Sequence, residues 1–146
     1  MLVDANALSA DATASLANFS ISPDGRYVAF SSSANNLVAN DTNGTISDIF
    51  VRDTSDQVTT RVSIGSTGTQ GNNTSYTPAL SGNARYVAFE SLASNLVTGD
   101  TNSTGDVFVH DRETGTTTRI SISGAGSQAN GSSTQPSLSA DGRYVA

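Results

Sequence analysis

The sequence predicts an all-β protein built from tandem four-stranded antiparallel sheets, and three observations support this prediction. The segment at residues 26–30, Arg-Tyr-Val-Ala-Phe, returns intact at residues 85–89 and begins again at Arg143. Ser and Thr fill 41 of the 146 positions, whereas hydrophobic residues make up 36% and charged residues 14%. Short stretches also alternate polar and apolar residues between polar turns, which is typical of half-buried strands.

The repeats are spaced by 59 and then by 58 residues. Between residues 26–41 and residues 85–100, eleven of sixteen positions are identical. The one-residue difference in period falls in a loop, which spans residues 41–48 in the first copy and residues 100–106 in the second. Since insertions are tolerated in loops, we interpret the chain as an array of one supersecondary unit.

Each unit is expected to contain four strands. Residues 18–22 alternate polar and apolar side chains, and Pro23-Asp24-Gly25 then provides a tight turn into the strand at residues 26–30. This second strand is apolar on both faces, so both faces should be covered.

The third and fourth strands are expected at residues 49–52 and 58–64. In the second unit, Gly82-Asn83 is expected to form the hairpin turn. The predicted division of the chain is an N-terminal segment at 1–16, which we interpret as the end of a preceding repeat, then units at 17–75 and 76–134 and half a unit at 135–146.

Three motifs of the first unit carry a family resemblance. They are S-P-D-G-R-Y-V-A-F at residues 22–30, D-I-F-V-R-D at residues 48–53 and T-T-R-V-S at residues 59–63. Together they resemble the blade repeat of TolB-type, WD-like β-propellers. The resemblance implies tandem propeller-type blades, and about two and a half units predict an incomplete ring, because propellers close with roughly four to eight blades. The alternative is a β-sandwich, if the repeats pack as two facing sheets.

Composition excludes several classes of partner. The net charge is −6, and all seven basic residues are isolated arginines, so no nucleic-acid partner is expected.

No apolar run is long enough for a membrane span, and the amino end has no signal peptide features. The acidic chain lacks cysteine and lysine and is rich in Ser, Thr, Asn and Gly, which favours an extracellular or cell-surface, bacterial-type secreted protein.

Two acidic loops are the candidate metal sites. The six candidate ligands, three from each unit, are Asp41, Asn43, Asp48, Asp100, Asn102 and Asp106. Carboxylate and amide oxygens at this spacing suit Ca²⁺, which would have a structural role in pinning the loops. The alternative is that the same residues form Asx turns and begin strands.

No catalytic site is expected. His110 is the only histidine, and it occupies the position that Arg52 has one unit earlier, so we expect a solvated strand position there. No G-x-S-x-G motif accompanies the many serines, which argues against a Ser-His-Asp triad. Asp53 and Asp111, which close the third strands, are expected to cap a turn or to pair with an arginine.

Three functions remain open at this point. The first is a non-catalytic scaffold or binding module that binds a protein or a glycan through its loops, with calcium at the acidic loops as a candidate stabilising ion. The second is a structural subunit that forms a homo-oligomer or polymer, a ring or a filament, by strand completion. The third is the accessory propeller of a larger secreted hydrolase.

Overall fold

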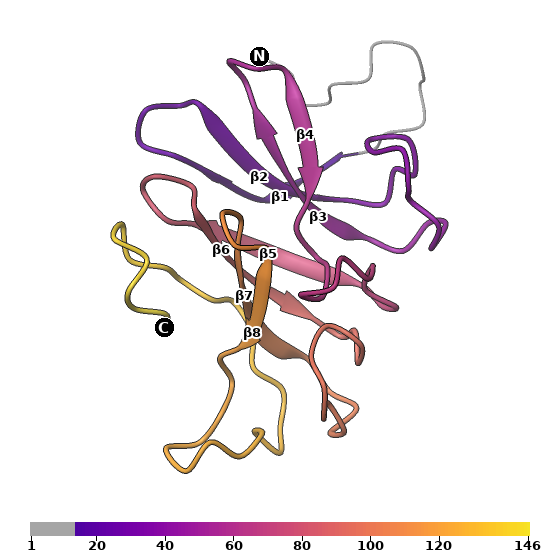
Figure 1. Cartoon of the computed structure of the whole chain (residues 1–146), viewed down its shortest axis with the longest axis vertical. Helices are drawn as coiled ribbons and strands as arrows, with labels where there is room; N and C mark the ends of the chain where they lie inside the picture. The colour runs from indigo at the N-terminus through magenta and orange to yellow at the C-terminus, as the bar shows by residue number, and fades with distance from the viewer. Residues whose placement is uncertain (1–13) are drawn as a thin grey trace.

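The structure is a computed structural model, which describes the backbone of residues 14–146 and the side chains of residues 18–146 (Figure 1). Most of the segment predicted at 1–16 therefore lies outside the described residues. Eight strands form two four-stranded antiparallel sheets, as the sequence predicted. The described range contains no helix, and so none that is long and apolar enough to cross a membrane.

Each sheet consists of four consecutive strands in sequence order, one sheet per repeat. The first sheet contains β1 (Ala14–Ile21), β2 (Tyr27–Ser32), β3 (Asp48–Asp53) and β4 (Val58–Arg61), and the second contains β5 (Ser75–Leu80), β6 (Tyr86–Ser91), β7 (Asp106–Asp111) and β8 (Thr116–Arg119). The register is the same in both sheets: Phe30 faces Phe50, and Phe89 faces Phe108. The ring centroids lie 5.9 Å apart in each pair. The two repeats are therefore the same unit in three dimensions.

The fourth strand is shorter than the sequence predicted. β4 ends at Arg61, although Val62 remains buried, and Ile64 then makes an isolated bridge with Gln70. After β4 the chain leaves the first sheet, and the loop that follows folds toward the second unit.

The hairpin turns of the two units differ at one position. Gly25 has φ +72° and donates its N–H to the carbonyl of Ser22. In the second unit Asn83 accepts from the N–H of Arg85, as expected of a turn residue, but the left-handed conformation lies at Ala84 (φ +55°) and not at Gly82. The turn expected at Gly82-Asn83 is therefore confirmed, and the residue with positive φ is the one that follows Asn83.

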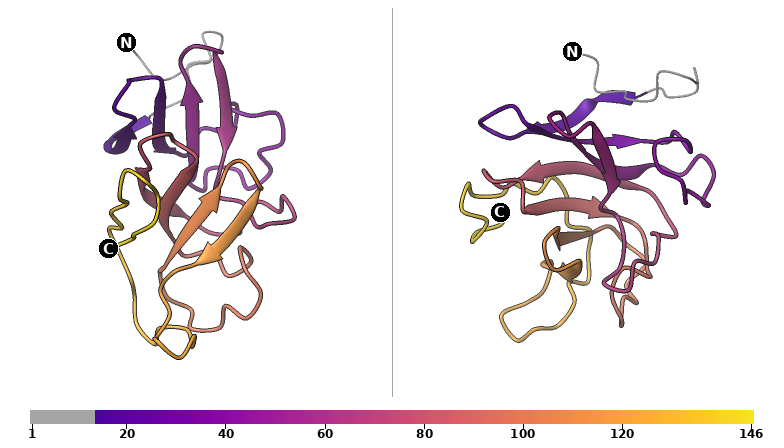
Figure 2. Two further views of the ribbon diagram at one scale, coloured as in Figure 1. Left: turned by 60° about the vertical axis from the view of Figure 1, so that its left-hand side comes forward. Right: turned by 45° about the horizontal axis from the view of Figure 1, so that its top comes forward.

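The two sheets lie against each other (Figure 2), and the side chains that meet between them come from unlike faces of the two units. The core between them combines Ala29, Ile49, Val51 and Val62 of the first sheet with Val87, Phe89, Ala93, Leu96 and Phe108 of the second unit. Val87 and Phe89 are the counterparts of Val28 and Phe30, which lie on the opposite face of the first sheet. A head-to-tail relation of this kind is the stacking of neighbouring blades, whereas a β-sandwich would bring two inner faces together.

The same main-chain link joins each unit to the next. Ser75 donates its N–H to the carbonyl of Ser47, and Ser133 donates to Gly105 at the equivalent place, both at 2.8 Å. The described part of the third unit is a hairpin with a bridge between Leu138 and Val145. The fold is thus an array of propeller-type blades that does not close into a ring.

Candidate functional site

The first acidic loop folds into a closed polar cluster. The side chain of Asp48 is fully buried at the start of β3. Its Oδ1 accepts from Ser63 Oγ at 2.6 Å, and its Oδ2 accepts from Asn43 Nδ2 at 3.0 Å and from Gln70 Nε2 at 2.9 Å. Gln70 Nε2 also donates to Asp41 Oδ1 at 2.8 Å, so the three predicted residues do meet.

An arginine that the sequence analysis did not single out completes this cluster. Arg61 Nη1 lies 3.6 Å from Asp41 Oδ1 and 3.7 Å from Asp48 Oδ2, and Arg61 Nη2 donates to the carbonyl of Asn40. Burial raises the pKa of Asp48, while the three hydrogen bonds and the charge of Arg61 act in the opposite direction.

The second unit repeats the cluster atom for atom. Asp106 accepts from Ser121 Oγ, Asn102 Nδ2 and Gln128 Nε2. Gln128 also donates to Asp100, and Arg119 Nη1 lies 3.5 Å from Asp100 Oδ1 and 3.8 Å from Asp106 Oδ2. All six predicted residues therefore belong to two equivalent polar clusters.

The atoms that face the centre of these clusters suit an arginine side chain better than a calcium ion. Both amides, Asn43 and Asn102, turn their nitrogen toward the aspartate, whereas a calcium ion would need their oxygen. Across residues 14–146, no three His, Cys, Asp or Glu side chains group closely enough to hold a metal ion. A calcium ion would have to displace a guanidinium that already lies beside both carboxylates, so calcium binding stays a prediction.

The cluster residues that were missed could have been found from spacing. Arg61, Ser63 and Gln70 recur 58 positions later as Arg119, Ser121 and Gln128, the same list of partners in the same order. A polar residue that repeats with the period of the fold usually has the same partner in each unit.

Each unit also has an arginine–aspartate ion pair at its hairpin end. Arg26 donates to both carboxylate oxygens of Asp53, Nε to Oδ1 and Oδ2 at 3.1 Å and Nη2 to Oδ2 at 2.8 Å, and Arg85 likewise donates to both oxygens of Asp111. Asp53 also accepts from the N–H of Ser55. Arg26 holds the pKa of Asp53 well below its usual range, and Arg85 does the same for the pKa of Asp111. The expectation that these two aspartates pair with arginines and cap turns is confirmed.

The position of His110 contradicts the expectation of a solvated residue. Only 4% of its surface is exposed, and burial lowers its pKa. Its Nδ1 lies 2.9 Å from Thr117 Oγ1, and this hydroxyl donates to the carbonyl of Ile64 in the preceding unit. Arg52 has the same strand position but lies on the outer face of the first sheet, where no described unit packs. Arg52 and His110 therefore differ in burial although they hold equivalent positions, because a described unit packs only against the sheet face that carries His110.

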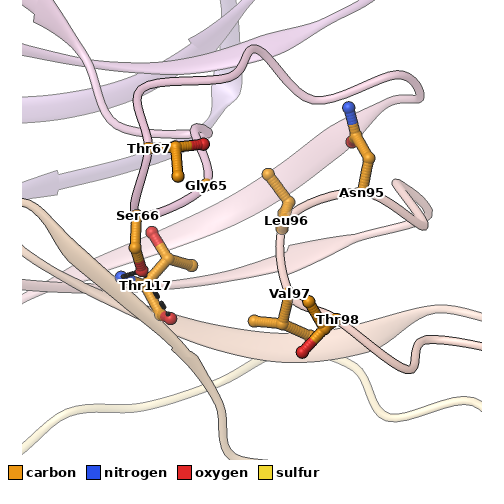
Figure 3. Close-up of a pocket in the computed structure, with 8 residues that line it drawn as sticks. All are labelled: Gly65, Ser66, Thr67, Asn95, Leu96, Val97, Thr98 and Thr117. Carbon is orange, nitrogen blue, oxygen red and sulfur yellow. Dashed lines mark hydrogen bonds between the residues drawn. The ribbon is translucent and has the colours of Figure 1, made fainter.

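A pocket of about 460 Å³ lies between the two units, and we call it the seam pocket (Figure 3). Its lining residues are Gly65, Ser66, Thr67, Asn95, Leu96, Val97, Thr98 and Thr117. The loop after β4 forms one wall, the loop after β6 forms the other, and Thr117 of β8 closes one end. No ionisable side chain lines it.

The two walls of the seam pocket are fastened by side-chain hydrogen bonds. Asn95 accepts from the N–H of Asn72 and donates to the carbonyl of Gln70. Asn72 and Ser94 bond each other twice, Nδ2 to Oγ and N–H to Oδ1. A Cβ atom at Gly65 would lie 3.1 Å from the carbonyl oxygen of Leu96, so the small residue permits this close approach. The pocket is consequently preformed.

Comparison with known proteins supports the fold. No family model matches the sequence, and no curated protein sequence matches it either. Among solved structures, TolB from Acinetobacter baumannii superposes with a TM-score of 0.55 and 21% identity, over 88% of this chain and 25% of TolB. A chain from a structural and mechanistic study of two prolyl endopeptidases superposes with a TM-score of 0.51 and 19% identity, over 88% of this chain and 17% of that one. The fold is therefore of the TolB-like β-propeller type, and the chain spans a quarter or less of these structures.

Proposed function

We propose that this protein is a non-catalytic, propeller-type scaffold and binding module that acts outside the cell or at its surface. Its stacked sheets provide the rigid framework, and the loops at the seam between units bind a protein or a glycan. The observation that carries the proposal is the seam pocket, which is preformed, uncharged and of a size typical of ligand sites.

The absence of catalysis is inferred from how the charged groups are used. Asp48 and Asp106 are engaged in the two polar clusters, and Asp53 and Asp111 in the arginine pairs. His110 is buried and bonded to Thr117. An acid or base must reach a substrate, and these described groups instead stabilise the fold.

The proposed location rests on composition. The chain is acidic and free of cysteine and lysine, and its loops are rich in Ser, Thr, Asn and Gly. Calcium binding by the acidic loops is the alternative to clusters held by arginine, and thermal melting in 5 mM CaCl₂ against EDTA distinguishes the two, at roughly the millimolar affinity of extracellular sites. Because Arg61 and Arg119 each already lie beside both carboxylates of their cluster, we expect equal melting temperatures, and a higher melting temperature in calcium would establish the metal site.

Self-assembly is a second candidate function, and one observation favours it. Phe19 and Ile21 on β1 are 55% and 53% exposed, whereas their counterparts Pro78 and Leu80 are covered by the first unit. An open apolar face of this kind can associate with another copy. Size-exclusion chromatography with light scattering tests this candidate, since a monomer at high concentration would eliminate it. The role of an accessory propeller in a larger secreted hydrolase stays a prediction.

The proposed function is tested by NMR titration of the 146-residue protein. Two mixtures serve as probes, one of capped tripeptides and one of neutral oligosaccharides. Binding by the loops should shift amide signals within residues 65–72 and 92–99 while the probes stay chemically intact. Cleavage of a probe, or no shift with either mixture, would contradict the proposal.

A further inference from the structure

The chain contains two Asn-Gly sequences, and the structure places them in different environments. They are Asn43-Gly44 in the first acidic loop and Asn130-Gly131 in the connection between the second and third units. In an Asn-Gly sequence the main-chain nitrogen of the glycine can attack the side-chain carbon of the asparagine, because glycine has no Cβ atom to obstruct the approach. The freedom of the asparagine side chain then decides whether the reaction occurs.

The side chain of Asn43 is held through its nitrogen. Nδ2 donates to Asp48 Oδ2 at 3.0 Å and to the carbonyl of Gly71 at 3.3 Å, and the carboxylate of Asp48 is fully buried. The reaction requires this side chain to turn toward the main chain of Gly44 and to release Nδ2 as ammonia. Both hydrogen bonds would have to break first, so the polar cluster should protect Asn43.

Asn130 has no such restraint. Asn130 and Gly131 are both exposed, and no hydrogen bond within the described residues uses the side chain of Asn130 or the N–H of Gly131. A Cβ atom at Gly131 would meet nothing within 4 Å, so the surrounding atoms leave room for the two reacting groups to approach each other.

The equivalent asparagine one unit earlier is restrained. Asn72 lies 58 positions before Asn130, and it is followed by Asn73 where Asn130 is followed by glycine. Asn72 accepts from the N–H of Ser94 and donates through Nδ2 to Ser94 Oγ. Asn130 therefore departs from the repeat in the freedom of its side chain and in the residue that follows it.

The chain on either side of Asn130 is fastened to the second unit. Ala129 accepts from Asn102 Nδ2 at 2.9 Å, and Ser133 donates its N–H to the carbonyl of Gly105 at 2.8 Å. Asn130 thus lies in a short exposed segment between two anchored residues. An added main-chain atom in this segment would alter the link that joins the second unit to the third.

We infer that Asn130 is a site of spontaneous deamidation, whereas Asn43 is protected by its polar cluster. The nitrogen of Gly131 loses its proton and bonds to Cγ of Asn130, and the bond between Cγ and Nδ2 breaks as ammonia leaves. A water molecule then opens the succinimide ring. Opening at one carbonyl gives aspartate, and opening at the other gives isoaspartate, which lengthens the main chain. Either product adds a negative charge.

Peptide mapping by mass spectrometry tests the inference on the 146-residue protein. The protein is incubated in mildly alkaline buffer, which favours loss of the main-chain proton. Deamidation at Asn130 should be at least about tenfold faster than at Asn43 in the folded protein. In concentrated urea, which disrupts the polar cluster, the two sites should react at similar rates because both are Asn-Gly sequences.

Two matched variants test the role of the glycine. Gly131→Ala should slow deamidation at Asn130 by about tenfold or more, since the added methyl group obstructs the attacking nitrogen. Gly124→Ala, at an equally open site in the same connection, is the control and should leave this rate unchanged. Neither glycine has a positive φ, so alanine introduces no backbone strain at either site.

Three outcomes would overturn the inference. Equal rates at Asn43 and Asn130 in the folded protein would show that the polar cluster gives no protection. Deamidation of Asn130 in urea but not in the folded protein would show that the loop holds the residue in an unreactive conformation. A slower rate at Asn43 that persists in urea would assign the difference to local sequence. None of these outcomes bears on the proposed function of the seam pocket.

Discussion

The buried charged side chains of this protein have the same partners in each repeat unit. Arg61 and Arg119 each compensate two buried or nearly buried aspartates, and each does so at the same place in its unit. Buried carboxylates need a partner because their charge loses the solvation of water. The polar clusters therefore attach a long loop to the start of the third strand in each unit.

Removal of this partner gives a first prediction. Arg61→Met should lower the free energy of unfolding by about 3 kcal/mol, since it leaves Asp41 and Asp48 without a compensating charge. Arg52→Met is the control, because Arg52 is half-exposed on an outer face and should cost about 1 kcal/mol or less. Urea unfolding of both variants measures the difference, and equal losses would show that Arg61 has no special role.

The buried histidine gives a prediction of pH dependence. The folded-state pKa of His110 is lowered from about 6.5, so below that pH the unfolded chain binds more protons than the folded chain. Stability should therefore be complete above about pH 6.5 and decrease as the pH falls toward the folded-state pKa, with a slope of at most about 1.4 kcal/mol per pH unit. Because this is the only histidine, His110→Gln should remove this part of the profile in urea unfolding from pH 7.5 to 5.5. An unchanged dependence of stability on pH in the variant would contradict the assignment to His110.

At the scale of the elements, each blade depends on tight hairpins whose geometry is set by one left-handed residue. Gly25, Ala84 and Gly142 hold this position in the three units, with φ between +55° and +73°. A residue with a Cβ is strained there, and the second unit accepts that strain at a buried alanine. The two paired strands on either side of the turn thus impose the left-handed conformation on whichever residue holds this position.

The strain can be measured in the first unit. Gly25→Ala should destabilise the protein by about 1 kcal/mol, although nothing lies within 4 Å of the added Cβ atom. Gly124→Ala is a matched control, because that site is equally open but does not have a positive φ, and it should be neutral or slightly stabilising. Thermal melting distinguishes the two, and equal effects would indicate that backbone conformation is not the cause.

At the scale of the whole molecule, the two sheets share one core through unlike faces. Phe89 is fully buried against the first sheet, whereas Phe19, on the face of the first sheet that has no described neighbour, is 55% exposed. Stability in such an array comes from contacts between neighbours as much as from contacts within each unit.

The shared core predicts cooperative unfolding. Phe89→Ala should lower the free energy of unfolding by about 3–5 kcal/mol, and Phe19→Ala by about 1 kcal/mol or less. In the Phe89→Ala variant, amide hydrogen exchange of β2 and β6 should become faster together. Faster exchange in β6 alone would show that the sheets are stable independently.

The sequence indicated most of the fold because each unit is defined by local patterns. Alternating side chains fixed the strands, and the 58-residue period fixed the equivalence of the two sheets. The same spacing could have revealed Arg61, Ser63 and Gln70 as partners of the acidic loop. It could not show that Asn43 presents its nitrogen, since that depends on which groups surround it.

The sequence by itself determined the repeat and the succession of strands within each unit, because these follow from residues close in the chain or related by a fixed period. Only the tertiary structure decided the environment of His110, the seam pocket and the exposed face of β1. Each of these depends on whether a neighbouring unit packs against a given face, and two positions with the same local sequence can differ in that respect.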